Sequence, residues 1–157
     1  MKHSYFSRRL LSVFMAFALG LSVLLAKDFV VVIDAGHGGH DPGSLGSKAK
    51  EKNINLGVAL KLGRLIENNM QGVKVVYTRK KDVYLTLQER ANIANKVQGD
   101  LFISIHTNSL DKKSPNRRKV AGASTWTLGL HRSKENLEVA KRENSVIYLE
   151  NDFSTRY

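Results

Sequence analysis

The chain has 157 residues, a formal net charge of +11 at pH 7 and no cysteine. The lack of cysteine excludes disulfide bonds and any zinc site built on thiolates, so a metal site here would need histidine and carboxylate ligands. The length suits one domain, and the basic charge favours an anionic partner such as a charged polymer, lipid head groups or nucleic acid.

The first 26 residues have the layout of a secretory signal peptide. Basic residues precede an uncharged run from Leu10 to Ala26. This order predicts export with cleavage, which would leave residues 27–157 as the mature domain. The run is also at the short limit for a membrane span of about 17–25 residues, so an uncleaved anchor is the alternative. An exported protein, in the periplasm or cell envelope, would meet cell-wall polymer or lipid rather than nucleic acid.

Strand and helix patterns alternate between residues 29 and 105. Apolar runs rich in β-branched residues predict buried strands at Phe29–Ile33, Val73–Tyr77 and Leu101–Ile105. Apolar residues at helical spacing predict amphipathic helices at Asn53–Asn68 and Thr86–Val97. This order of elements is typical of an α/β fold with a parallel sheet and right-handed crossovers.

The pattern weakens after Ser109. The basic stretch Asp111–Lys119 contains a proline and predicts a solvated loop, and Gly122–Leu128 is a candidate fourth strand. Lys134–Glu150 is polar with interspersed apolar residues, which predicts a helix of modest amphipathicity.

The first predicted strand runs into a loop with the sequence IDAGHGGHDPG, residues 33–43. Glycine, histidine and aspartate in this number suit either a phosphate cradle or a metal site. The phosphate interpretation is weak because both Gly-Lys-Ser/Thr and Gly-x-Gly-x-x-Gly are missing, and because Pro42 prevents a helix from opening directly at the loop. A metal site is therefore the better interpretation.

Two histidines follow the ends of predicted strands. His37 comes after the first strand and His106 after the third, and ligands gather at the carboxyl ends of parallel strands. Glu51, near the start of the first predicted helix, is the candidate third ligand because the helix dipole suits an anion there. Two histidines and a carboxylate with an open fourth position are typical of catalytic zinc. Non-haem iron oxygenases use the same donors, but normally on β-barrel scaffolds.

Six motifs occur in the order and spacing of a known family: IDAGHGGHDPG, EKNINLGVALKLGRLI, VVYTR, LQERANIAN, DLFISIHTN and GASTWTL. By these motifs, which run from Val31 to about Leu128, the chain resembles the zinc-dependent N-acetylmuramoyl-L-alanine amidases of the Amidase_3 family. The resemblance implies an α/β fold with a central, mostly parallel sheet flanked by helices. It also implies hydrolysis of the amide bond between N-acetylmuramic acid and the L-alanine of the peptidoglycan stem peptide.

The resemblance carries over to single residues. It implies that His37, Glu51 and His106 are ligands of Zn²⁺. Further residues match recurring framework positions: Arg79, Arg90, Asn95, Ser104 and Asn108. We expect Arg90 to hold a buried carboxylate such as Asp100, and Asn108 to orient a ligand or contact substrate.

The C-terminal part departs from the family pattern. The family's general-base glutamate lies in a late segment resembling VExGF, and nothing in residues 129–157 matches it. We interpret four glutamates there as charges on a polar helix rather than as the base: Glu135, Glu138, Glu143 and Glu150. We therefore expect no general base in this chain, with the family base beyond Tyr157, and a sheet that is incomplete at its C-terminal end.

The final segment, from about residue 129, resembles the inserted helical region of division-type members. In those proteins the region lies over the active site until a partner protein displaces it. The sequence thus indicates a partial amidase domain with impaired activity, an activating partner and peptidoglycan as substrate. The alternatives are a non-catalytic half-domain that binds peptidoglycan or a regulator, and a zinc deacetylase or peptidase acting on another bond of the wall.

Overall fold

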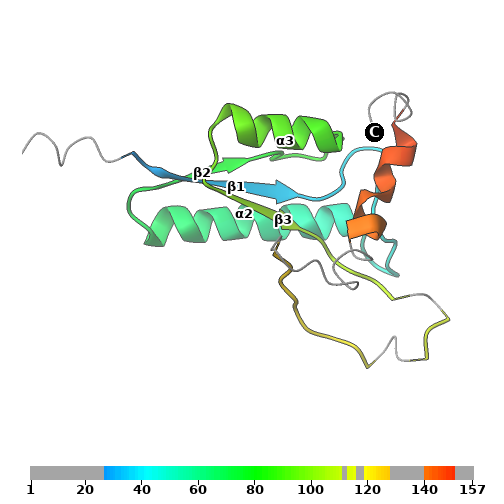
Figure 1. Ribbon diagram of the computed structural model, residues 1–157. Coiled ribbons are helices and arrows are strands. Elements are labelled where there is room, and N and C mark those ends of the chain that lie inside the picture. Colours follow the sequence, from blue (N-terminus) through cyan, green and yellow to red (C-terminus); the bar gives the residue numbers. More distant parts are fainter. Residues whose placement is uncertain (1–26, 111–112, 116–118, 128–139, 151–157) are drawn as a thin grey trace, which may run out of the picture.

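The structure is a computed structural model that describes residues 27–110, 113–115, 119–127 and 140–150 (Figure 1). The predicted signal peptide, residues 1–26, lies outside these ranges, as do parts of the predicted basic loop and of the last predicted helix. In the ranges that are described, no helix has both the length and the apolar character needed to cross a membrane.

Three parallel strands form the sheet in the order β2-β1-β3, which confirms the predicted α/β fold. They are β1 (Phe29–Ala35), β2 (Val73–Tyr77) and β3 (Leu101–Ile105). The central strand β1 pairs with both neighbours, and Val31 lies opposite Val75 on one side and Leu101 on the other. All residues of β1 after Phe29 are buried, as its continuous apolar sequence predicts for a strand covered on both faces.

Two helices cover opposite faces of the sheet (Figure 1). Helix α2 (Glu51–Asn69) begins two residues before the predicted start, and helix α3 (Leu87–Lys96) matches its prediction closely. The core between β1 and α2 is apolar and contains Val31, Ile33, Ala35 and Ala59, with Leu56, Leu62 and Ile66 packed against it. A capping box, in which Thr86 and Glu89 satisfy each other's backbone N–H groups, begins α3.

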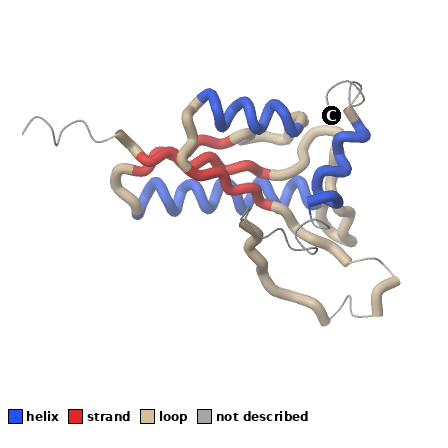
Figure 2. The backbone as a smooth tube through the Cα atoms, in the orientation of Figure 1, coloured by secondary structure: helices blue, strands red, loops and turns tan. Residues whose placement is uncertain are grey.

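The region after β3 differs from the expectation. Residues 122–127 of the candidate fourth strand are exposed and irregular, and no strand pairing involves them. A strand needs a ladder partner, and these residues have none among the described parts of the chain. The last predicted helix is confirmed in part, because residues 140–143 are α-helical and continue into the 3₁₀ helix η2 (Asn144–Leu149). Figure 2 shows this helical segment beside the loop that follows β1.

Candidate metal centre

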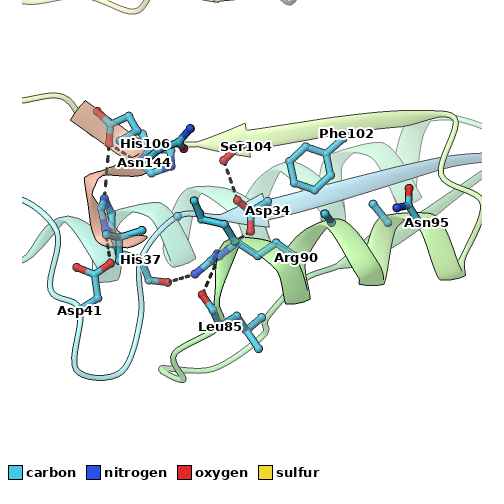
Figure 3. A pocket seen from close by; sticks show the side chains of 16 residues that line it. Asp34, His37, Asp41, Leu85, Arg90, Asn95, Phe102, Ser104, His106 and Asn144 are labelled. Atoms are coloured by element: carbon cyan, nitrogen blue, oxygen red, sulfur yellow. Dashed lines mark hydrogen bonds and ion pairs between the residues drawn. The ribbon is translucent and has the colours of Figure 1, made fainter. Parts of the chain in front are cut away.

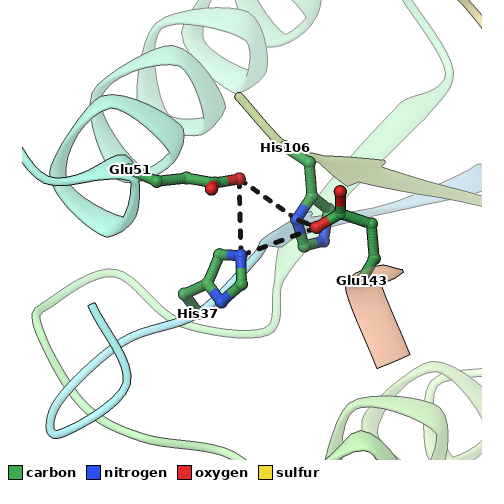
Figure 4. Close-up of side chains that lie close together, drawn as sticks. All are labelled: His37, Glu51, His106 and Glu143. Carbon is green, nitrogen blue, oxygen red and sulfur yellow. Dashed lines mark ion pairs between the residues drawn. The ribbon is translucent and has the colours of Figure 1, made fainter. Parts of the chain in front are cut away.

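Four side chains from distant parts of the sequence converge at the carboxyl edge of the sheet (Figure 4). His37, Glu51, His106 and Glu143 each offer one ligand atom, and these atoms all lie within 4.8 Å of one another. Oε1 of Glu51 lies 3.3 Å from Nε2 of His37 and 3.3 Å from Nδ1 of His106. The three residues predicted as ligands are therefore brought together, while their binding of a metal remains a prediction.

Glu143 is the member of this group that the sequence analysis missed. Its Oε2 lies 2.9 Å from Nδ1 of His106 and 3.7 Å from Nε2 of His37. The expectation that Glu143 is only a charge on a polar helix was wrong. The family resemblance of its segment, which indicates a region lying over the site, was the one signal that pointed toward this position.

The ring nitrogens that face the cluster could serve as ligands of a shared cation. Nε2 of His37 and Nδ1 of His106 are buried and have no hydrogen-bond partner in the described structure. Carboxylate oxygens of Glu51 and Glu143 lie 2.9 to 3.7 Å from these two nitrogens, so nitrogens and oxygens surround a common space. Two imidazole nitrogens and carboxylate oxygens are a donor set that suits Zn²⁺.

The charges of the cluster also favour a cation. Burial by itself would lower the pKa of His37, but contacts with Asp41, Glu143 and Glu51 raise it to about 11. Burial opposes protonation of His106 as well, yet Glu143 and Glu51 raise its pKa to about 9. Burial would raise the pKa values of Glu51 and Glu143, whereas the two histidines hold both far below the ordinary range. The two carboxylates thus create a negative site that either protons or a metal ion can neutralise.

Glu51 is held in place by its own helix and by the strand end opposite. It is the first residue of α2, and its Oε1 accepts hydrogen bonds from the backbone N–H of Thr107 at 2.8 Å and from Nδ2 of Asn55 at 3.3 Å. Its Oε2 accepts from the N–H of Ser44 at 2.9 Å. Asn55 is fully buried and is itself fixed by the hydroxyl of Thr107, which donates to its Oδ1 at 2.7 Å. This network orients the carboxylate toward the cluster.

Two glycines make room for the histidines. A Cβ atom at Gly43 would lie 2.6 Å from the ring of His37, and one at Gly36 would overlap the ring of His106. Gly43 also has a φ of +63°, and His37 itself has a φ of +62°, a conformation that is costly for a residue with a side chain. The glycines of this loop therefore leave the space that the two imidazole rings occupy, as a metal site here would require.

Arg90 binds the C-terminal end of β1 and the start of the loop that follows it (Figure 3). Its buried guanidinium donates to Oδ1 of Asp34 at 2.7 Å, to the carbonyl of Ala35 at 2.9 Å and to that of His37 at 3.0 Å. The expected buried carboxylate is present, but it is Asp34 rather than Asp100. Asp100 precedes β3 at the opposite end of the sheet, where its Oδ2 accepts from the N–H of Val30 at 2.7 Å.

The other framework residues also support the loops around the cluster. Arg79 is buried and donates to the backbone carbonyls of Ala35, Gly36 and Lys52. Ser104 donates to the second oxygen of Asp34 at 2.7 Å, and Asn95 lines the cavity described below. Asn108 is exposed, and its side-chain oxygen accepts from Arg142 at 2.7 Å. Its predicted contact with a ligand or substrate stays a prediction.

A cavity of about 440 Å³ adjoins the cluster on the α3 side of the sheet (Figure 3). Its walls include Phe102 and Ser104 from β3 and Ala91 and Asn95 from α3. Asn144 and Val146 of η2 also line it, and Asn144 lies near His106 (Figure 3). The helical segment that supplies Glu143 thus also forms part of the wall of the space beside the cluster.

Comparison with known proteins shows one family. The family model described as N-acetylmuramoyl-L-alanine amidase, Amidase_3, matches residues 31–154. The amidase AmiC of Escherichia coli O6:H1 is 38% identical over 100 residues, which are 63% of this chain and 24% of that protein. The sporulation-specific N-acetylmuramoyl-L-alanine amidase of Bacillus subtilis is 43% identical over 79 residues, covering 50% of this chain and 31% of that protein.

Solved structures show the same similarity. The amidase AmiC2 of Nostoc punctiforme has a TM-score of 0.51 and 40% identity, covering 54% of this chain and 47% of that one. An N-acetylmuramoyl-L-alanine amidase from Clostridium difficile 630 has a TM-score of 0.52 and 36% identity, covering 56% and 47%. The chain spans about half or less of the length of the curated relatives that it matches.

Proposed function

Because the chain belongs to the N-acetylmuramoyl-L-alanine amidase family, we propose that it acts on peptidoglycan as a zinc-dependent hydrolase. The bond cleaved is the amide between N-acetylmuramic acid and the L-alanine of the stem peptide. The observation that carries the proposal is the convergence of His37, Glu51 and His106, with two buried ring nitrogens that have no hydrogen-bond partner in the described structure.

In this proposal the ligand atoms are Nε2 of His37, Oε1 of Glu51 and Nδ1 of His106. A zinc ion held there supplies Lewis-acid polarisation of the scissile carbonyl and lowers the pKa of water. The protein's own contribution is positional. Asn55 and the backbone of Thr107 hold the carboxylate, and Arg90 holds the carbonyl of His37, so that the donors are fixed before an ion arrives.

The 140–150 segment is proposed to hold the site closed. Glu143 contacts both histidines, Arg142 donates to Asn108, and Oε1 of Glu150 accepts from the N–H of Leu87 at 3.3 Å. The segment is therefore anchored at three points across the cluster. Substrate would need this segment to move away, and a partner protein that binds the segment would be an activator.

The substrate and location follow from charge and from the N-terminal pattern. The basic chain suits a polymer whose stem peptides carry carboxylates, and the apolar run at residues 10–26 suits export to the periplasm or cell envelope. In this proposal residues 1–26 are a signal peptide and residues 27–157 a partial catalytic domain, whose final part from about residue 129 is regulatory.

The proposal is tested by incubating the purified chain and zinc with peptidoglycan. Because the 140–150 segment lies against the cluster and nothing in residues 129–157 matches the family's general-base segment, the expected result is slow release of stem peptides that begin with a free L-alanine amino group, identified by mass spectrometry. The variant His106→Ala should release none. Sedimentation of the chain with peptidoglycan, without any peptide release above this variant, would favour the non-catalytic half-domain instead. Release of acetate or cleavage within the stem peptide would favour a deacetylase or a peptidase.

A further inference from the structure

We propose that Asp41 is a positioning residue, which fixes the ring of His37 so that Nε2, and not Nδ1, is presented to the metal. The inference rests on the proposed metal centre and concerns a residue outside the predicted ligand set. Oδ2 of Asp41 lies 2.7 Å from Nδ1 of His37, on the side of the ring opposite the cluster (Figure 3).

The chemistry of a carboxylate selects one form of the ring. An ionised carboxylate only accepts hydrogen bonds, so the proton of a neutral His37 must reside on Nδ1. The lone pair is then left on Nε2, the nitrogen that lies 3.3 Å from Oε1 of Glu51. A carboxylate behind a metal-binding histidine also increases the basicity of the ring and restricts its rotation.

Asp41 is itself rigidly placed. It is 6% exposed, and its Oδ1 accepts the N–H of Gly43 at 3.1 Å, which leaves Oδ2 for His37. The backbones of Gly38 and Asp41 exchange two hydrogen bonds, each 3.0 Å long. The turn that carries His37 therefore also carries its partner, and the distance between the two side chains is determined by a short closed loop.

The second histidine is positioned in a different way. His106 presents Nδ1 to the cluster, and its ring packs directly on the backbone of Gly36. Its Nε2 receives no carboxylate contact from the residues that the structure describes. Loss of the Asp41 carboxylate should consequently disturb the His37 ligand and leave His106 in place.

The test compares Asp41→Asn with Asp82→Asn. Asp82 is a matched control because it also fastens this loop, accepting from the N–H of Gly39 at 2.8 Å and from Lys52 at 2.6 Å, but does not contact His37. In asparagine one of the two carboxylate oxygens is replaced by an NH₂ donor, so an oxygen that still accepts from Gly43 leaves an N–H group facing Nδ1 of His37. Zinc affinity, measured by competition with a chromophoric chelator, should fall about 10–100-fold for Asp41→Asn. For Asp82→Asn it should stay within about threefold.

A measurement on the unmodified chain accompanies the variants. Nitrogen NMR of the zinc-loaded chain with ¹⁵N-labelled histidine should show a protonated Nδ1 and a metal-bound Nε2 for His37. Metal bound to Nδ1 of His37, or equal zinc affinities of the two variants, would overturn the role of Asp41 while leaving the proposed function intact. Failure of the unmodified chain to bind zinc would overturn the proposed function and this inference with it.

Discussion

Oε2 of Glu143 lies 2.9 Å from Nδ1 of His106, although the two residues are far apart in the sequence. Glu51 already supplies a carboxylate to the same nitrogen at 3.3 Å. The cluster therefore holds one more acid than the three-ligand pattern needs, and the additional acid comes from the segment that covers the site.

Replacing Glu143 by alanine should open the site without removing zinc. The three remaining ligands are expected to retain the ion, while a competing internal group is lost, so the open population should rise. We expect removal of zinc by an external chelator to become about fivefold faster or more. Stopped-flow chelation measures this rate. Glu67→Ala, an exposed change on α2, serves as the control, and equal rates for both variants would argue against closure by Glu143.

Replacing Arg90 by methionine should strongly destabilise the fold. The change leaves Asp34 buried without its cation, and breaking a buried pair in this way costs about 3–5 kcal/mol. Urea unfolding followed by circular dichroism gives the change in free energy. The double variant Asp34→Asn with Arg90→Met should lose clearly less than the sum of the two single losses. Additive losses would show that the pair is not coupled.

Replacing either of two glycines of α2 by alanine should change the stability of the fold, in opposite directions for the two positions. A Cβ atom at Gly63 would overlap the phenol of Tyr77, whereas one at Gly57 meets nothing within 4 Å. Gly57→Ala should therefore stabilise the chain by about 0.5–1 kcal/mol, because alanine favours the helix. Gly63→Ala should destabilise it by about 1–3 kcal/mol, because the core must shift. Thermal unfolding of the two variants checks the signs, and equal signs would contradict the described packing.

Removal of metal should make stability depend on pH above neutrality. In the metal-free chain the pKa of His106 is raised from 6.5 to about 9, so its protonated ring contributes stability that is fully present below pH 6.5. This contribution is lost as pH rises toward 9. In zinc-loaded protein the rings are held neutral by the ion, so the same decline should be missing. Urea unfolding at pH 6.5 and 9, with and without chelator, measures the difference; parallel declines would contradict the prediction.

Local patterns account for the part of the fold that could be predicted. The apolar run of β1 and the helical spacing in α2 and α3 are direct consequences of burial, and the structure confirms them. The proximity of His37 and His106 was also predictable, since parallel strands β1 and β3 end at the same edge.

Contacts between segments that are far apart in the sequence were harder to predict. Asp34 and Asp100 were both possible partners of Arg90, and only the end of the sheet at which each lies decides for Asp34. The irregular state of residues 122–127 depends on whether β3 finds a further strand, which no local pattern determines. Glu143 was missed because its position depends on tertiary folding of a polar segment with weak periodicity.

The two faces of β1 differ in a way that protects its alignment. Ile33 faces the apolar layer against α2, and its neighbour Asp34 faces Arg90 under α3. A slip of one residue would push an ionised carboxylate into hydrocarbon and strand a guanidinium opposite an isoleucine. A shifted register of the strand that leads into His37 would thus bury both a carboxylate and a guanidinium without partners. Charge as well as packing therefore fixes the position of that imidazole.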